Sequence, residues 1–146
     1  MKRAGFTMIE LIFVIVILGI LAAVAIPKLS ATRTDAEVSK MATDTATLIS
    51  DLGAYYTSQG TFAGANITDI TNFDTGKSLT SLRDTNFFNI MDGNSNICLK
   101  VTFVNVKDGK VTIANGAGRS SVCTSVRSAT ANLIKTYQFG GSQIKR

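Results

Sequence analysis

Near its start, the sequence has a long apolar stretch. Over Phe6–Ile26 almost every side chain is apolar, and Glu10 is the one charged residue. A helix that crosses a bilayer needs roughly 20 mainly apolar residues, so the pattern predicts a membrane-spanning helix over 6–27. Basic residues precede the stretch and favour a cytoplasmic N-terminal end with the rest of the chain exported. Basic residues also follow it, which weakens this orientation signal.

Beyond Pro27 the apolar positions recur every three or four residues. This spacing predicts an amphipathic helix over 28–57 that packs on a globular core and stops near Gly60. One helix from Phe6 to about Thr57 would be roughly 78 Å long at 1.5 Å per residue. A small soluble domain cannot cover such a helix, so its first half needs lipid or other copies of the chain. The apolar stripe consists of Val38, Met41, Thr45, Leu48, Leu52 and Tyr55.

The middle of the chain is irregular and then alternates. Residues 60–96 are rich in Gly, Asn, Thr and Asp, and we expect a long loop region with one short helix around Ser78–Thr85. Over Ile97–Phe103 apolar and polar positions alternate, which is typical of a half-buried strand. Asp108-Gly109 is a strong turn signal. Lys110–Asn115 is therefore predicted to return as the paired strand.

The last segment has helical spacing. A helix is expected after residues 116–118 and should end at Gly140-Gly141. The predicted fold class is α+β: a long N-terminal helix, membrane-spanning in its first half, packed on a small antiparallel sheet with a C-terminal helix. The apolar positions that predict this last helix are Val122, Val126, Ala129, Leu133 and Tyr137.

The composition excludes most chemistry. The chain has no His, which removes the commonest general base and the commonest metal ligand. No nucleophile–base pair or cluster of metal ligands stands out, so we expect no enzyme, no bound metal and no cofactor. The formal net charge of +5 is too small and too dispersed to predict nucleic-acid binding.

The two cysteines, Cys98 and Cys123, are 25 positions apart. This does not match the paired spacing of a zinc site. In an exported domain the simplest interpretation is one disulfide, worth roughly 3–4 kcal/mol for a loop of this size in the chain-entropy model. The alternative is two buried free thiols, which requires a body that stays in the cytosol.

The segment Asp92–Asn96 begins like a calcium-binding loop, with oxygen-bearing side chains at alternate positions. The glycine such a loop needs is replaced by Ile97, and the bidentate acid at its twelfth position is replaced by Phe103. We therefore interpret the segment as a polar turn.

Three interpretations compete for the apolar stretch: a plain single-pass anchor, a secretory signal peptide cut near Ala23-Val24-Ala25, and a leader cut ahead of the stretch. Glu10 discriminates among them. A carboxylate inside an apolar span costs several kcal/mol unless it has a partner, so it is usually functional. A plain anchor or a signal peptide gains no function from such a carboxylate, so neither explains why Glu10 is present.

Residues Met1–Leu11 have a short basic leader, Gly5 followed by Phe6, and an acid four positions after Phe6. This pattern resembles the leader and methylation motif of type IV pilins and type II secretion pseudopilins, and the resemblance extends to about Lys28. It implies that residues 1–5 are a leader peptide, that a membrane peptidase cuts after Gly5, and that the new N-terminus at Phe6 is methylated. Residues 28–146 would then form the exported globular body.

The same resemblance gives a role to Glu10, and two further residues have a structural consequence whatever the family. In a stacked bundle the Glu10 carboxylate would meet the Phe6 amine of a neighbouring copy, each charge relieving the burial cost of the other. Gly19 and Pro27 are soft points at which the helix should kink or loosen, because proline removes a backbone hydrogen bond and crowds the carbonyl four residues earlier. The alternative for Pro27 is that it marks the end of the span.

We therefore expect a structural subunit of a type IV pilus or related pseudopilus, inserted in the bacterial inner membrane as a precursor. Its partners would be other copies of itself in a helical homopolymer, a prepilin peptidase and methylase, the inner-membrane assembly machinery, and lipid before assembly. One alternative is a type II secretion or DNA-uptake pseudopilin. A remoter one is an exported binding domain on a simple anchor or signal peptide, which leaves Gly5-Phe6 and Glu10 unexplained.

Overall fold

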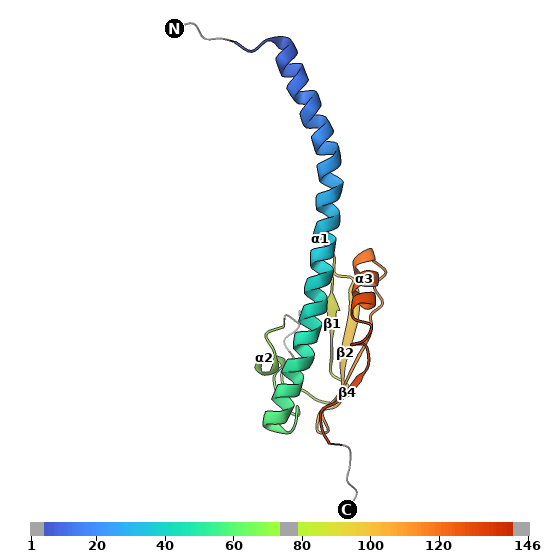
Figure 1. Cartoon of the computed structure of the whole chain (residues 1–146). Helices are drawn as coiled ribbons and strands as arrows, with labels where there is room; N and C mark the ends of the chain where they lie inside the picture. Colours follow the sequence, from blue (N-terminus) through green and yellow to red (C-terminus); the bar gives the residue numbers. More distant parts are fainter. Residues whose placement is uncertain (1–4, 74–78, 142–146) are drawn as a thin grey trace, which may run out of the picture. The chain divides into compact units, whose positions relative to one another are not determined.

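The computed structural model describes residues 5–73 and 79–141 (Figure 1). The chain divides into two units, Met1–Ala36 and Glu37–Arg146, which we describe separately. Helix α1 (Met8–Gln59) begins in the first unit and continues in the second. This confirms the single long helix predicted from the apolar stretch and the amphipathic stripe. Helix α1 ends at Gln59 and is followed by Gly60, which has a φ of 72° and donates its N–H to the carbonyl of Tyr56 over 2.7 Å.

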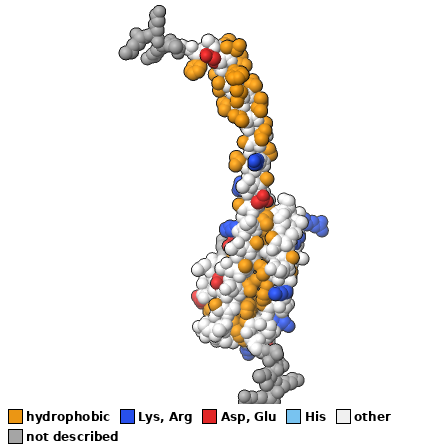
Figure 2. Space-filling view, in the orientation of Figure 1, with side chains coloured by type: hydrophobic (Ala, Val, Ile, Leu, Met, Phe, Trp, Pro, Cys, Tyr) orange, Lys and Arg blue, Asp and Glu red, His pale blue; other side chains and the backbone are white. Residues whose placement is uncertain are grey.

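The part of α1 in the first unit is apolar and exposed. Figure 2 shows hydrophobic side chains around this part of the helix. By length and composition α1 is apolar enough to cross a membrane, and none of its most apolar window is buried. The structure thus agrees with the expectation that this stretch is made for lipid or for other chains. Its helix is continuous through Gly19 and Pro27, so the kink predicted between them stays a prediction.

The second unit is built on an antiparallel sheet of β1 (Phe87–Met91), β2 (Ile97–Asn105), β3 (Lys110–Asn115) and β4 (Thr136–Gln138), in that order across the sheet. The predicted hairpin is confirmed: β2 and β3 pair with Val101 opposite Ile113, and the connecting turn includes Gly109 at a φ of 64°.

One face of the sheet and the body half of α1 form the core. The predicted helical stripe supplies four buried residues, Met41, Thr45, Leu48 and Leu52. The inward positions of β2 and β3 are fully buried as the alternation predicted. Phe62 lies between these layers, and its ring packs edge-on against Tyr56 and Phe103. The buried strand residues are Leu99, Val101, Phe103, Val111 and Ile113.

The long loop predicted over 60–96 is wrong in part, because it contains helix α2 (Ile67–Ile70) and strand β1. The short helix predicted around Ser78–Thr85 is also wrong for residues 79–85, and Ser78 lies outside the described residues. Ser81 and Thr85 have φ values of 54° and 70°, which a right-handed helix cannot accommodate. Leu82 instead donates its N–H to the carbonyl of Ala65 and is buried.

The C-terminal helix is shorter than predicted. Helix α3 (Ser121–Ala129) ends at Thr130, and the segment that follows becomes β4. The Thr130 hydroxyl donates to the carbonyl of Val126, and the Leu133 N–H turns back to the carbonyl of Thr130. Tyr137, which was assigned to the helix, pairs with Val111 across the sheet instead.

Candidate functional site

The N-terminal end of α1 holds Glu10 in a reciprocal cap. The Glu10 carboxylate accepts hydrogen bonds from the backbone N–H and the hydroxyl of Thr7, each over 2.7 Å at Oε2. The Thr7 hydroxyl in turn accepts from the Glu10 N–H over 3.4 Å. This is the capping box, in which a threonine and a glutamate three residues later satisfy otherwise unpaired donors at a helix start. It explains why α1 begins at Met8.

This cap gives Glu10 a partner inside its own chain. Both bonds fall on Oε2, and Oε1 accepts no hydrogen bond from any residue the structure describes. The acid therefore lies in an exposed apolar helix with one oxygen held and the other open to a second donor. The spacing from Thr7 to Glu10 is itself a sequence signal of this cap, although we predicted a role for Glu10 alone.

Gly5 and Phe6 directly precede this cap. A side chain at Gly5 would meet no atom within 4 Å, and Phe6 is 89% exposed. The peptide bond between them is thus open on the Gly5 side and lies just ahead of the helix. Residues 1–4, the rest of the predicted leader, lie outside the described residues. Cleavage at this bond and methylation of Phe6 stay predictions.

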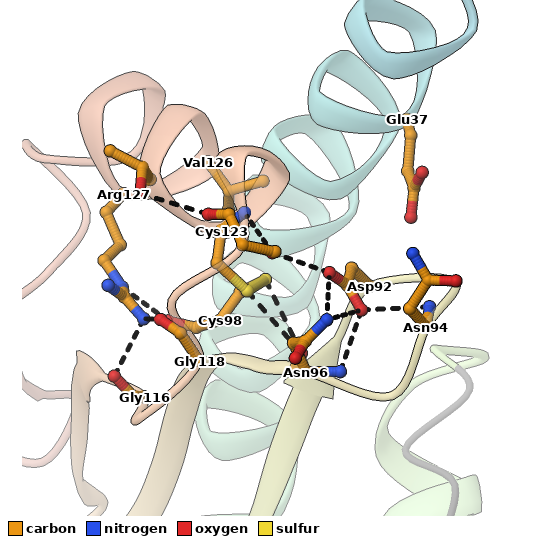
Figure 3. Close-up of a disulfide and its surroundings, with 12 residues drawn as sticks. Glu37, Asp92, Asn94, Asn96, Cys98, Gly116, Gly118, Cys123, Val126 and Arg127 are labelled. Atoms are coloured by element: carbon orange, nitrogen blue, oxygen red, sulfur yellow. Dashed lines mark hydrogen bonds between the residues drawn. A yellow bond between two sulfur atoms is a disulfide. The ribbon is translucent and has the colours of Figure 1, made fainter.

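The body carries a second cluster of polar side chains, around a disulfide (Figure 3). Cys98 of β2 and Cys123 of α3 are bonded to each other, with their Cα atoms 4.5 Å apart. This confirms the disulfide that we predicted for an exported body. It ties the start of β2 to the first turn of α3, and both cysteines are fully buried.

Asp92 links the turn after β1 to the start of α3. Its carboxylate accepts hydrogen bonds from the backbone N–H groups of Asn94 and Asn96, from the Asn96 amide and from the Ser120 hydroxyl. Ser120 is the N-cap of α3 and accepts from the Cys123 N–H. Burial raises the pKa of Asp92, but the bonds from Ser120 and Asn96 outweigh it and leave that pKa below its usual value.

This geometry is a hydrogen-bonded turn, as the sequence analysis interpreted Asp92–Asn96. One carboxylate oxygen of Asp92 and the two sulfur atoms lie within 4.8 Å of one another, a spacing that could hold a metal ion. The sulfurs, however, are bonded to each other, and the carboxylate is engaged by N–H and O–H donors. These atoms serve to join segments of the body.

Arg127 is a further structural residue that sequence reasoning missed. From the last turn of α3 its guanidinium donates to the carbonyls of Cys98, over 3.2 Å, and of Gly116, over 2.9 Å, and also to that of Gly118. It therefore connects α3 to β2 and to the β3–α3 connection, beside the disulfide (Figure 3). No sequence signal identifies it, because its acceptors are main-chain atoms brought together by the fold.

The comparisons with known proteins bear on the first of these two clusters. The family model described as the prokaryotic N-terminal methylation motif matches residues 1–26. No curated protein and no solved structure matches the chain.

Residues 1–26 thus form a prepilin-type N-terminus, with an acid inside an apolar helix. More particularly, this segment has the leader motif of type IV pilins and pseudopilins. The motif supports assigning the chain to that family. The α+β arrangement of a long N-terminal helix, a four-stranded antiparallel sheet and a further helix is a pilin-like layout. The motif implies processing by a prepilin peptidase and polymerisation into filaments, and it fits insertion of a precursor in the inner membrane.

Proposed function

We propose that this chain is the structural subunit of a type IV pilus or a related pseudopilus, without enzymatic activity. One observation carries the proposal: the matched motif places an acid four residues after Phe6, in an exposed apolar helix where an unpartnered carboxylate would be costly. A subunit that pairs this acid with a neighbouring copy has a use for it. A simple anchor does not.

The proposed sequence of events starts with a membrane precursor whose body is exported to the periplasm. Cleavage between Gly5 and Phe6 releases the leader and leaves a charged amine on Phe6, which is then methylated. Methylation retains the positive charge. The amine of one subunit then approaches Glu10 of a neighbour, whose Oε1 is open while Thr7 holds Oε2. This pair sets the register of the stacked helices more than it adds net stability.

The filament type is the finer part of the proposal. Pro27 is the only proline in the chain, so the proline-containing motif that follows the long helix in major secretion pseudopilins is absent. This favours a surface pilin or a divergent pseudopilin over a typical major secretion pseudopilin. A DNA-uptake pseudopilin shares the same N-terminal helix and is the other candidate.

A deletion strain separates these filament types. We expect loss of surface filaments and of twitching motility, with exoprotein release and natural transformation retained, and restoration of filaments by the chain supplied in trans. Loss of exoprotein release alone would assign the chain to a secretion pseudopilus, and loss of transformation alone to DNA uptake. Unchanged filaments, motility, release and transformation would contradict the proposed function.

A further inference from the structure

The body has an open groove beside α1 that the proposed assembly through the N-terminal helix does not use. The groove has a volume of about 740 Å³ and runs between the body half of α1 and the edge strand β1. Its apolar lining includes the buried Met41 and Ile90, the half-buried Phe73, and Met91, which is 43% exposed. All of these residues belong to the second unit.

The α1 side of the groove is acidic. Glu37, Asp44 and Asp51 all line it and are spaced seven residues apart, which places them along one face of the helix. Lys40 is the one basic residue among them. None of the four forms an ion pair with another residue that the structure describes, although Glu37 accepts the Gly93 N–H over 2.6 Å and Asp51 accepts the Thr71 hydroxyl over 2.7 Å. The groove therefore combines apolar lining with excess negative charge.

The outward face of the sheet has the opposite character. The four strands contain two lysines, Lys100 and Lys110, and no acidic residue. Because Leu99, Val101 and Val111 point into the core, the alternation of strand residues places both lysines on the outward face.

Apolar side chains accompany these lysines. Phe87 and Val104 are among the few large hydrophobic residues of the body that are exposed, at 39% and 42%. Both lie at outward positions of their strands, and the Lys100 ammonium is 4.1 Å from the centre of the Phe87 ring. In Figure 2 most of the basic side chains visible on the body gather along one edge, and the acidic ones lie mostly toward the other.

We infer that the acidic groove is a docking site for a second copy of this chain, which inserts the outward face of its sheet. The two surfaces are complementary in charge and both carry exposed apolar groups, the combination that steers and then holds a protein interface. Since the groove and the sheet face are different surfaces, the contact is head-to-tail and leaves one of each free at the ends. Such heterologous contacts form rings where the rotation between copies closes and open helical assemblies where it does not, and a filament requires the second.

This inference rests on the proposed function, because it names the body-to-body contact of the same filament. It adds a register determinant separate from Glu10. It also explains why the acids recur at seven-residue intervals along α1 without basic partners among the described residues of their own chain.

Paired cysteines in the full chain test the contact. Thr47 lines the groove and Val104 lies on the sheet face, and Cys98 and Cys123 are already bonded to each other. In cells that make the chain, Thr47→Cys with Val104→Cys should give a ladder of disulfide-linked multimers after mild oxidation. Neither single variant should dimerise efficiently. Efficient dimerisation of Thr47→Cys alone would mean that two grooves face each other, and it would contradict the head-to-tail contact.

Charge reversal provides the matched control. In the double-cysteine chain, Asp44→Lys with Asp51→Lys should lower the ladder yield about tenfold, because like charges would then face each other. Adding Lys100→Glu with Lys110→Glu should restore it. Reversal of two basic residues outside the strands, Arg83→Glu with Lys107→Glu, should leave the yield unchanged.

The outcomes separate this inference from the proposed function. Filaments without a ladder would overturn the docking site and leave filament assembly standing. A ladder in membranes of cells that form no filaments would support the docking site and count against the proposed filament. A ladder that survives the acid reversal undiminished would overturn the charge complementarity on which the site rests.

Discussion

Replacing Glu10 with alanine should abolish filaments while leaving the leader cleaved. The bond that we propose is cleaved precedes Phe6 and lies outside the helix, so this variant leaves it unchanged. Without the carboxylate, the amine at Phe6 of an incoming subunit has no opposite charge to meet inside the apolar bundle. An unpaired buried charge costs several kcal/mol, which is enough to stop growth. Immunoblots for the processed chain and electron microscopy of sheared filaments measure the two effects.

Glu10→Gln is the control that separates charge from helix capping. Glutamine at this position can still accept the bonds from Thr7 that start α1, because a capping box takes Glu or Gln. It cannot pair with an amine as a carboxylate does. We expect Glu10→Gln to fail as Glu10→Ala does, and Asp35→Ala, at another exposed acid of α1, to assemble normally. Normal filaments from Glu10→Gln would assign the residue to capping and remove its role in assembly.

Removing the disulfide should have the largest effect on the stability of the body. A cross-link between positions 25 residues apart contributes about 3–4 kcal/mol in the chain-entropy model. Cys98→Ala with Cys123→Ala should therefore lower the free energy of unfolding of the body by about that amount, measured by urea titration of the detergent-solubilised chain with far-ultraviolet circular dichroism. The reduced wild-type chain is the matched control and should show a similar loss.

The hydrogen bonds around the disulfide should keep the body folded when the disulfide is removed. Arg127 bonds the carbonyl of Cys98 and the β3–α3 connection, and Asp92 bonds Ser120 at the start of α3. We expect the chain without the disulfide to keep α3 in place in the absence of urea, with an unchanged native circular dichroism spectrum. An unfolded body without urea would show that these bonds do not hold α3, and an unchanged unfolding midpoint would contradict the disulfide's contribution.

Long periodic segments of this sequence predicted their structure well. The stripe from Val38 to Tyr55 and the alternation over Ile97–Phe103 each repeat often enough to fix the element and its buried face. The turn at Asp108-Gly109 then joins the two predicted strands, as observed. In both segments the apolar positions of the sequence are the positions that face the core, because one face of each element is buried.

Short elements held by distant partners could not be predicted in this way. Strand β1 has four apolar residues among its five and does not alternate, and two of these, Phe87 and Met91, are exposed. Strand β4 has three residues and forms because Tyr137 lies opposite Val111. Its residues continue the helical spacing of α3. Only the turn at Thr130 and the pairing with β3 show that this segment is a strand and not part of the helix.

The residues of the candidate site also fall into a group that a local sequence motif predicts and a group that only the fold brings together. Gly5, Phe6 and Glu10 stand in a local motif, and the Thr7 cap could be read from the same few residues. The bond from Ser120 to Asp92 and the bonds from Arg127 to main-chain carbonyls join segments that are apart in the sequence, so no residue pattern records them. The acidic groove combines both kinds of information: its seven-residue spacing is in the sequence, but its opposite wall comes from the fold.

Mass spectrometry of the mature N-terminus tests the central claim most directly. Purified from the membranes or filaments of its own cells, the chain should begin at Phe6 and carry a methyl group on its α-amine, with Met1–Gly5 removed. A chain that begins at Ile26 would be an ordinary secreted protein cut by signal peptidase. A chain that still begins at Met1 would be an uncleaved anchor, and either result would contradict assembly as a processed pilin-type subunit.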